Sequence, residues 1–252
     1  MDLGLSDKTV VVTGGARGLG RTVSLVFADE GANVAVLDKN IEGAEETAQM
    51  VREKSRKAVA VQVNLGDYED VSSAFEKVVA ELGPVDVLAY CAAITDNMAK
   101  IEDMSVENWK KEIDVNLGGA FYCIKQVGPK MAERGWGRIV MISSRAGLDG
   151  GFGQCSYSSS KAGLCGLAKT AALEYGRKGV TANVIFPSLA NTPATQSLPK
   201  DVVQRIVKKI PTRRLQEPEE FASVLVFLAS NQACNINGAE IMVTGGIELF
   251  SF

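Results

Sequence analysis

Short apolar runs alternate with longer amphipathic segments along the chain. The runs are apolar throughout rather than alternating, and several are rich in valine and isoleucine, a pattern typical of parallel strands buried on both faces. They span residues 8–13, 33–38, 58–63, 85–90, 137–142, 180–186 and 239–243. In the first segment between runs, one helical face carries Leu19, Val23, Val26 and Phe27. Further helices are expected over residues 41–55, 67–82, 105–133, 156–178 and 217–229.

This alternation predicts an α/β fold built on an open, doubly wound parallel sheet with helices on both faces. Neither an internal repeat nor a Pro/Gly-rich linker divides the sequence, so we expect residues 1–252 to form a single domain. The least regular segment is 187–212, which holds four of the seven prolines. It follows the carboxyl end of a strand, where ligands bind in such sheets, and we expect a mobile flap over a substrate.

Composition narrows the class of function. Hydrophobic residues form 46% of the chain, which is enough for a large core. The net charge is −3 with no long run of one sign, so neither nucleic acid nor a membrane is an expected partner. No apolar stretch reaches the length of a membrane span, and the N-terminus has no signal-peptide core. The five cysteines include no Cys-x-x-Cys pair, which indicates reduced thiols in a cytoplasmic protein.

The chain contains no histidine. This absence excludes a Ser-His-Asp triad, histidine general bases and histidine-ligated zinc, and we expect no metal site. Any acid–base chemistry must therefore use tyrosine, lysine, aspartate, glutamate or cysteine side chains.

A glycine-rich turn lies between the first expected strand and the first expected helix, where residues 13–20 read Thr-Gly-Gly-Ala-Arg-Gly-Leu-Gly. Gly14 permits a tight turn, while Gly18 and Gly20 let the backbone approach a pyrophosphate at the helix N-terminus. The spacing Gly-x-x-x-Gly-x-Gly has one residue more in the turn than the usual Gly-x-Gly-x-x-Gly. A merely structural turn is the alternative, but the position between strand and helix favours dinucleotide binding.

Asp38 ends the second expected strand, eighteen residues after Gly20. A carboxylate there accepts hydrogen bonds from the adenosine ribose and repels a 2′-phosphate, which favours NAD over NADP. Arg17 and Lys39 argue the other way, because either cation can pair with a phosphate. A solvated strand end is the alternative interpretation of Asp38.

Tyr157 and Lys161 lie four residues apart, on one face of the helix expected over 156–178. A lysine ammonium beside a tyrosine stabilises the phenolate and lowers its pKa, so that Tyr157 can exchange a proton with a substrate oxygen. Ser144 would hydrogen-bond the same oxygen and polarise it. Asn116 would hold a water that links Lys161 to solvent.

Together these residues resemble the classical short-chain dehydrogenase/reductase family, from about Leu5 to Gly246. The resemblance implies a seven-stranded Rossmann sheet, the catalytic set Asn116, Ser144, Tyr157 and Lys161, and binding of the nicotinamide ribose by Lys161. The implied cofactor-binding residues are Gly14, Arg17, Gly18, Leu19, Gly20, Asp38, Asn64, Leu65, Ala92, Tyr157, Lys161, Pro187, Leu189 and Thr192.

Within that set, the resemblance places Asn64 and Leu65 beside the adenine, and Thr192 and the backbone near Leu189 beside the nicotinamide amide. It also implies a homo-oligomer, a tetramer or a dimer, built on the helices at 105–133 and 156–178. The small residues of the second helix would permit close approach between subunits; they are Ala162, Gly163 and Gly166.

The chain departs from the family pattern at three places. Residues 90–93 read Tyr-Cys-Ala-Ala where the family usually has Asn-Asn-Ala-Gly, so the last position lacks its glycine. Ser188 follows Pro187 where glycine is usual, and Thr244 stands where an aspartate usually precedes the late Gly-Gly. The catalytic groups are all retained.

The substrate pocket is expected to be lined by residues 94–97, 145–154 and 189–198. Gln154 either hydrogen-bonds a substrate or is a solvated loop residue, and Arg145 either binds a substrate anion or makes structural contacts. Leu148 and Phe152 indicate an apolar wall. The apolar tail at 247–252 is expected to pack against a neighbouring subunit.

The sequence leaves three functions open. The proton-transfer set and Asp38 favour an NAD-dependent oxidoreductase acting on a small secondary alcohol, ketone or hydroxy acid. An NADPH-dependent 3-oxoacyl-thioester reductase is the alternative, with Arg17 and Lys39 offsetting Asp38. A catalytically weak cofactor-sensing binding protein is the third, and only the departure at 90–93 argues for it.

Overall fold

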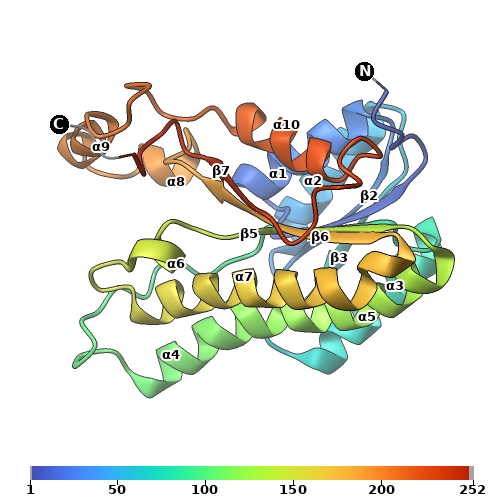
Figure 1. The fold of residues 1–252 in the computed structure, drawn as a ribbon, viewed down its shortest axis with the longest axis horizontal. Coiled ribbons are helices and arrows are strands. Elements are labelled where there is room, and N and C mark those ends of the chain that lie inside the picture. The colour runs from blue at the N-terminus through green and yellow to red at the C-terminus, as the bar shows by residue number, and fades with distance from the viewer. Residues whose placement is uncertain (1, 250–252) are drawn as a thin grey trace.

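Seven parallel strands form one twisted sheet in the computed structural model of the protein, which describes residues 2–249 (Figure 1). The strands are β1 (Thr9–Thr13), β2 (Asn33–Asp38), β3 (Ala58–Gln62), β4 (Val87–Tyr90), β5 (Gly137–Ile142), β6 (Val180–Pro187) and β7 (Glu240–Val243). Their order in the sheet is β3-β2-β1-β4-β5-β6-β7. The prediction of a doubly wound, seven-stranded parallel sheet of the Rossmann type is therefore confirmed.

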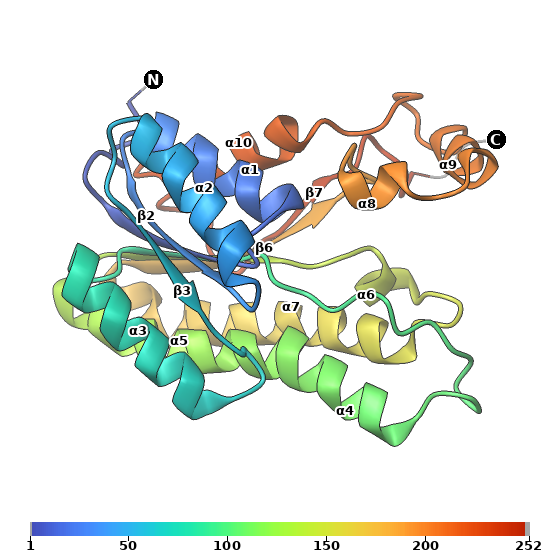
Figure 2. The ribbon, with the colours of Figure 1, turned by 180° about the vertical axis from the view of Figure 1, so that it is seen from behind.

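Helices cover both faces of this sheet (Figures 1 and 2). On one face lie α1 (Gly18–Asp29), α2 (Ile41–Glu53) and α10 (Pro218–Leu228), and on the other lie α3 (Tyr68–Leu82), α4 (Val106–Ile113), α5 (Gly119–Arg134) and α7 (Cys155–Tyr175). Each face has its own buried apolar cluster. Val10 and Val12 of β1 belong to one cluster and Val11 to the other, which explains why the strand is apolar throughout.

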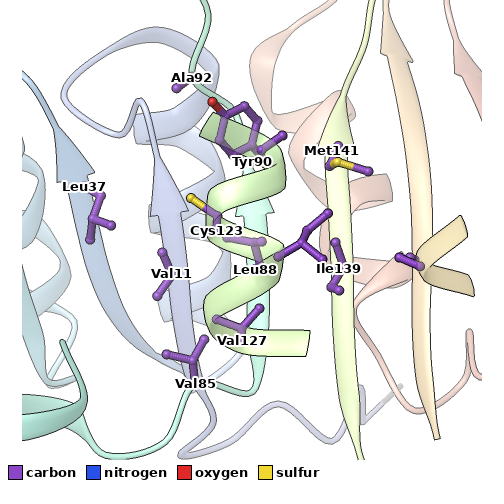
Figure 3. Close-up of a cluster of buried hydrophobic side chains, with 14 of the residues drawn as sticks. Val11, Leu37, Val85, Leu88, Tyr90, Ala92, Cys123, Val127, Ile139 and Met141 are labelled. Carbon is purple, nitrogen blue, oxygen red and sulfur yellow. The ribbon is translucent and has the colours of Figure 1, made fainter. Parts of the chain in front are cut away.

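The helix expected over 105–133 contains a wide turn. Residues Asp114–Gly118 (η1) adopt π-helical bonding between α4 and α5. The Tyr90 hydroxyl donates to the Val115 carbonyl in this turn. Figure 3 shows Tyr90 and Cys123 facing each other between β4 and α5, at the top of the buried cluster. Tyr90, which replaces the first asparagine of the family pattern, thus satisfies a backbone acceptor inside the core.

Three short helices lie outside the predicted elements: α6 (Ala146–Asp149), α8 (Pro193–Gln196) and α9 (Lys200–Val207). Two of them, α8 and α9, fall in 187–212, the segment that the sequence marks as the least regular. Helix α8 begins with a proline at its first position, and the Thr192 hydroxyl accepts from the Thr195 N–H. Pro at N1 and threonine at the N-cap are helix-start signals. The mobility of the segment stays a prediction.

The short 3₁₀ turn η2 (Gly176–Lys178) follows α7 and completes the helix expected over 156–178. At the opposite end of the sheet, segments that follow β4, β5 and β6 gather together with α6, α8 and α9 (Figures 1 and 2). This is the carboxyl end of the strands. The chain reverses its winding direction between β1 and β4, and ligands bind beside such a switch point.

Candidate active site

The glycine-rich turn brings β1 and β4 close together. Gly14 has a φ of +66°, and a Cβ on it would lie 2.7 Å from the Cα of Ala92. A Cβ on Gly20 would lie 2.2 Å from the Gly14 carbonyl oxygen. Gly18 begins α1 with a φ of +58° and has no atom close to its missing side chain, so its conformation rather than crowding requires glycine.

The N-terminus of α1 fits an anionic group. Arg17 occupies the N-cap position, and its side chain accepts no hydrogen bond from the first turn. The first N–H groups of a helix have no partner within the helix, and their partial positive charge favours phosphate. Together with the side-chain-free Gly18, this end of α1 has the form that a pyrophosphate requires.

Asp38 ties the end of β2 to the glycine turn. Its Oδ2 accepts from the Ala16 N–H at 3.0 Å, and its Oδ1 accepts from the Asn40 N–H at 3.0 Å. Each carboxylate oxygen has more than one lone pair, so these bonds leave capacity for ribose hydroxyls. Arg17 and Lys39, the two cations weighed against Asp38, are both exposed.

The departure at 90–93 is accommodated without backbone strain. The Thr13 hydroxyl accepts from the N–H groups of Cys91 and Ala92, at 3.1 and 3.3 Å, and this anchors the end of β4 to β1. Ala93 is exposed and does not have a positive φ, so this position does not need glycine in this chain.

Ser144, Tyr157 and Lys161 come together at the carboxyl end of β5. Ser144 follows β5, while Tyr157 and Lys161 project from the first two turns of α7. The Ser144 hydroxyl hydrogen-bonds Tyr157. Lys161 is 1% exposed, and its Nζ donates to the Ile142 carbonyl at 2.6 Å and lies 5.7 Å from the centre of the Tyr157 ring. The predicted proton-transfer set therefore shares one location.

The pKa values of Tyr157 and Lys161 are both shifted by burial in this structure. Burial raises the pKa of Tyr157, and the Ser144 hydrogen bond opposes the rise while the charge of Glu112 adds to it. Burial also lowers the pKa of Lys161 to about 8, against the opposing effects of Cys91 and Glu112. The predicted fall in the pKa of Tyr157 is not found in this geometry, because burial is the largest influence on the phenol and raises its pKa.

Asn116 lies in the π-helical turn and clamps two elements. Its Oδ1 accepts from the Ile94 N–H at 2.7 Å, and its Nδ2 donates to the Ile94 carbonyl at 3.0 Å and to the Ser160 hydroxyl at 3.3 Å. The side chain thus fixes the loop after β4 against α7. π-Helical turns often occur at functional sites because they redirect side chains. The role of Asn116 in holding a water stays a prediction.

The remaining expected cofactor residues lie at strand ends. Asn64 is exposed after β3, whereas the Leu65 side chain is buried in the core. Their place beside the adenine stays a prediction. Leu19 is half-buried in the first turn of α1. Pro187 ends β6, and Leu189 follows it, with its carbonyl accepting from the Gln216 N–H at 3.1 Å.

The structure distinguishes the expected substrate residues. Arg145 forms ion pairs with Asp149 and Glu248, whereas its buried Nη1 has no hydrogen-bond partner among the described residues, so both interpretations of Arg145 stay open. Gln154 pairs through its backbone with Ala99 beside the loop after β4. Among residues 2–249, no side-chain hydrogen bond of Gln154 decides between its two interpretations, and substrate binding by Gln154 stays a prediction.

Apolar side chains are exposed beside the site. Phe152 is 86% exposed, and Leu148 and Met98 are also exposed. Their place in an apolar pocket wall stays a prediction. In the tail, Leu249 is exposed, and residues 250–252 of the expected tail interface lie outside the described residues. A Cβ on the small residue Gly163 would lie 2.7 Å from the Leu117 side chain within the same chain, and its expected role between subunits stays a prediction.

Several side chains that the sequence did not single out also build the site. The Ser143 hydroxyl donates to the Lys161 carbonyl at 2.8 Å, and the Gln216 side chain joins the Ser188 N–H to the Val243 carbonyl. Glu112 is buried beside α7. Its spacing of four residues before Asn116 was the available signal, because both residues then share one helical face.

Among residues 2–249, no group of three or more cysteine, aspartate or glutamate side chains is arranged to hold a metal ion. Over the same range, no helix has the length and apolarity needed to cross a membrane. All five cysteines are free thiols.

The sheet, the glycine turn at its switch point and the adjacent helix N-terminus define a dinucleotide-binding α/β protein. Residues 8–203 match the short chain dehydrogenase family, and the chain belongs to this family. It is therefore an oxidoreductase of the class that acts on a CH–OH or carbonyl group with a nicotinamide cofactor.

Known proteins resemble the chain over nearly its whole length. It is 37% identical to a 3-oxoacyl-[acyl-carrier-protein] reductase of Staphylococcus epidermidis, covering 96% of this chain and 99% of the relative. Among solved structures, levodione reductase superimposes with a TM-score of 0.93 at 28% identity, covering 98% of this chain and 100% of the other. NAD⁺-bound xylitol dehydrogenase superimposes with a TM-score of 0.91 at 28% identity, covering 96% and 99%.

Proposed function

We propose that this protein transfers a hydride between NAD(H) and a small secondary alcohol, ketone or hydroxy acid, with Tyr157 as the general acid and base. The observation that carries the proposal is the meeting of Ser144, Tyr157 and Lys161 at the carboxyl end of β5, in the half of the sheet next to the glycine turn. A phenol, a hydroxyl and an ammonium in this arrangement supply proton transfer without histidine.

The residues present fit a dinucleotide. Gly14, Gly18 and the open N-terminus of α1 would hold the pyrophosphate, and Asp38 would accept from the adenosine ribose. Lys161 would bind the nicotinamide ribose, and Thr192 and the backbone at Leu189 would contact the amide. When bound, the nicotinamide supplies the hydride donor or acceptor.

The protein's own groups handle the proton. Ser144 hydrogen-bonds the substrate oxygen and stabilises the charge that develops on it. Tyr157 donates its proton to a carbonyl oxygen during reduction, or takes one from an alcohol during oxidation. Because burial raises the pKa of Tyr157, the phenol is protonated at neutral pH and ready to donate. Asn116 keeps the loop after β4 in place against α7.

Asp38 supports NAD rather than NADP. Its carboxylate is fixed by two backbone N–H groups at the end of β2, where a 2′-phosphate would be placed. A fixed negative charge cannot turn away from that phosphate, so the repulsion persists. Arg17 and Lys39 are exposed and are not held in place by a comparable set of bonds.

The second candidate is an NADPH-dependent 3-oxoacyl-thioester reductase. The 37% identical relative named 3-oxoacyl-[acyl-carrier-protein] reductase favours it. The exposed apolar side chains of Met98, Leu148 and Phe152 are compatible with an acyl chain. This candidate requires Arg17 and Lys39 to offset Asp38.

Fluorescence titration with NADH and with NADPH separates the two candidates. We expect NADH to bind at least about tenfold more tightly, which is worth about 1.4 kcal/mol. Asp38→Asn should narrow or reverse this preference, whereas Glu42→Gln, an exposed acid in the first turn of α2, should not change it. A preference of the unmodified protein for NADPH would overturn the first candidate in favour of the reductase.

Tyr157→Phe tests the proton-transfer role. The variant lacks only the hydroxyl, so we expect turnover of alcohols and ketones to fall at least about a hundredfold, while NADH binding stays within about threefold. Turnover is measured by absorbance of the reduced nicotinamide across a panel of secondary alcohols and ketones. Near-normal rates in this variant would contradict the mechanism.

The proposal extends to the oligomeric state of the protein and to its place in the cell. We expect a homo-oligomer, a tetramer or a dimer, through helices α4, α5 and α7. The five free thiols are compatible with a reducing compartment, and we expect the protein to be cytoplasmic.

A further inference from the structure

The segment 187–192 joins β6 to α8 and lies beside the proton-transfer group. The Ser143 N–H donates to the Ile185 carbonyl at 2.9 Å, so the end of β5 stays next to the end of β6. Ser144 is the residue after that bond. A hydride passes directly between the nicotinamide and the carbon whose oxygen is held there, so the ring must reach this end of the sheet. The segment 187–192 is therefore expected to form one wall of the nicotinamide site.

The shape of this wall depends on partners outside it. Residues 188–192 belong to neither a helix nor one of the seven strands. A local backbone bond joins the Thr192 N–H to the Ala190 carbonyl at 2.9 Å. A loop without repeating backbone bonds takes its shape from the partners that its N–H and C=O groups find elsewhere.

Gln216, in the loop before α10, supplies such partners through four hydrogen bonds. Its backbone N–H donates to the Leu189 carbonyl at 3.1 Å, and its carbonyl accepts from the Asn191 N–H at 2.8 Å. Its side-chain Oε1 accepts from the Ser188 N–H at 3.1 Å, and its Nε2 donates to the Val243 carbonyl at 2.8 Å. One glutamine thus contacts three residues of the wall and the end of β7.

The side-chain amide of Gln216 is buried and bonded at both ends. The residue is 8% exposed. An amide has an acceptor at one end and donors at the other, and here the acceptor meets an N–H while the donor meets a carbonyl. An apolar side chain of the same size offers neither group. Since Val243 lies opposite Pro187 in the register of β6 and β7, the amide ties the start of the segment to the neighbouring strand.

The fold does not depend on this amide. The Ser188 N–H also donates directly to the Val243 carbonyl, at 3.1 Å, so the two groups keep each other as partners when the amide is absent. The two backbone bonds of residue 216 are independent of its side chain. Loss of the amide should therefore loosen the segment without unfolding the protein.

We propose that Gln216 is a positioning residue for the nicotinamide half of the cofactor, whose side-chain amide holds the segment 187–192 in the shape that receives the carboxamide. The proposal rests on the function proposed above, because it presupposes a bound dinucleotide. It adds to that function a residue that contacts the wall of the site rather than the reacting atoms.

The adenosine half of the cofactor should not sense this residue. Asp38, which is proposed to bind the adenosine ribose, ends β2, whereas Gln216 bonds the ends of β6 and β7. In the sheet, β1, β4 and β5 lie between β2 and β6. ADP-ribose carries the adenosine, both phosphates and the second ribose but no nicotinamide. It is therefore a probe for every part of the dinucleotide except the ring that the segment receives.

Gln216→Met tests the inference by binding, without turnover. Methionine matches glutamine in length and has no amide. NADH affinity is measured by fluorescence titration and ADP-ribose affinity by calorimetry. We expect NADH to bind at least about fivefold more weakly than to the unmodified protein, while ADP-ribose affinity stays within about twofold. Retained ADP-ribose binding also shows that the variant is folded.

The emission of bound NADH gives a second measurement. A ring that is held against the protein emits differently from one in water, so the emission at saturation reports how firmly the nicotinamide is placed. It should shift toward that of free NADH in Gln216→Met. Gln216→Leu, which also lacks the amide, should show both effects if the methionine variant folds poorly. A merely structural role would weaken both ligands and leave the emission of the bound fraction unchanged.

Gln204→Met is the matched control, because Gln204 is an exposed glutamine on α9 and the same substitution is made. Both affinities should stay within about twofold. An unchanged NADH affinity in both Gln216 variants would overturn the inference, as would an equal loss for NADH and ADP-ribose. The proposed function fails instead if the unmodified protein binds neither NADH nor NADPH. If it prefers NADPH, the comparison is made with NADPH and 2′-phospho-ADP-ribose.

Discussion

Lys161 shows how this site places a charge where the solvent cannot reach it. The side chain crosses the interior from α7 to the end of β5, and its ammonium meets one backbone carbonyl, that of Ile142. One hydrogen bond does not replace the hydration of an ammonium, which is why burial lowers the pKa of Lys161 to about 8. The buried position that Lys161 needs for its proposed role in proton transfer therefore lowers the stability of the folded protein.

Lys161→Met should reveal that cost as a pH-dependent gain in stability. Below about pH 8 the lysine is protonated in both the folded and the unfolded protein, and the folded state bears the full desolvation cost. Between about 8 and its ordinary value of 10.5, the unfolded state binds more protons, so the stability of the unmodified protein rises with pH. The advantage of the variant should thus shrink by on the order of 3 kcal/mol between pH 7 and 10.5.

Urea unfolding at a series of pH values measures this difference. Lys169→Met is the control, because Lys169 lies on the same helix but is exposed and pairs with Glu240. It should show no gain at neutral pH. A constant difference between Lys161→Met and the unmodified protein across the range would show that the ammonium is hydrated after all.

At the scale of elements, the π-helical turn between α4 and α5 depends on one glycine. A Cβ on Gly119 would lie 2.5 Å from the Tyr90 hydroxyl and 2.7 Å from the Leu65 carbonyl oxygen. The second contact involves backbone, which cannot rotate away. The wide turn therefore fits against the sheet only because position 119 has no side chain.

Gly119→Ala should lower the free energy of unfolding by about 1–3 kcal/mol through overpacking. Gly118→Ala is a close control, because its added Cβ would have no neighbour nearer than 3.8 Å. The control should be neutral, or slightly more stable because alanine favours helix. Thermal unfolding followed by circular dichroism compares the two variants, and equal melting temperatures would contradict the packing argument.

The sequence predicted the elements that are marked by apolar runs or by an apolar helical face, and it missed short helices in a segment rich in proline. The runs at 33–38 and 137–142 coincide with β2 and β5, because continuous apolar runs mark buried parallel strands. Helices α8 and α9 were missed, since prolines in that segment resembled loop signals although one of them starts a helix.

The candidate site divides in the same way. The meeting of Ser144, Tyr157 and Lys161 followed from motif spacing on known element types. The pairing of Arg145 with Glu248 joins residues 103 positions apart, and no local pattern reports such a contact. The direction of the Tyr157 pKa was also beyond the sequence, because it depends on burial rather than on which residues are near.

At the scale of the molecule, α4, α5 and α7 form a layer that exposes large apolar side chains. Leu173 on α7 is 84% exposed and Phe121 on α5 is 48% exposed. Trp109 on α4 is also partly exposed. Such side chains on neighbouring helices support the proposed homo-oligomer, because association would remove them from water.

Phe121→Asp combined with Leu173→Asp should therefore reduce the molar mass in solution. The unmodified protein should run as a dimer or tetramer of the 26.8 kDa chain, and the double variant as a smaller species. Size-exclusion chromatography with light scattering measures both. Met50→Asp, at an exposed apolar residue of α2 on the opposite layer, should not alter the mass. An unchanged mass in the double variant would place any interface elsewhere.

The strand order also determines when each part of the site acquires its neighbouring strands during synthesis. β4 pairs with β1, and β5, β6 and β7 then each pair with the strand made just before them. The ribosome therefore delivers the later strands in the order in which the sheet edge accepts them. Both strands that flank β1, namely β2 and β4, have been synthesised when the chain reaches Tyr90. The part of the sheet that is proposed to bind the nucleotide is therefore complete first. Ser144, Tyr157 and Lys161 are then added at a sheet edge that already exists.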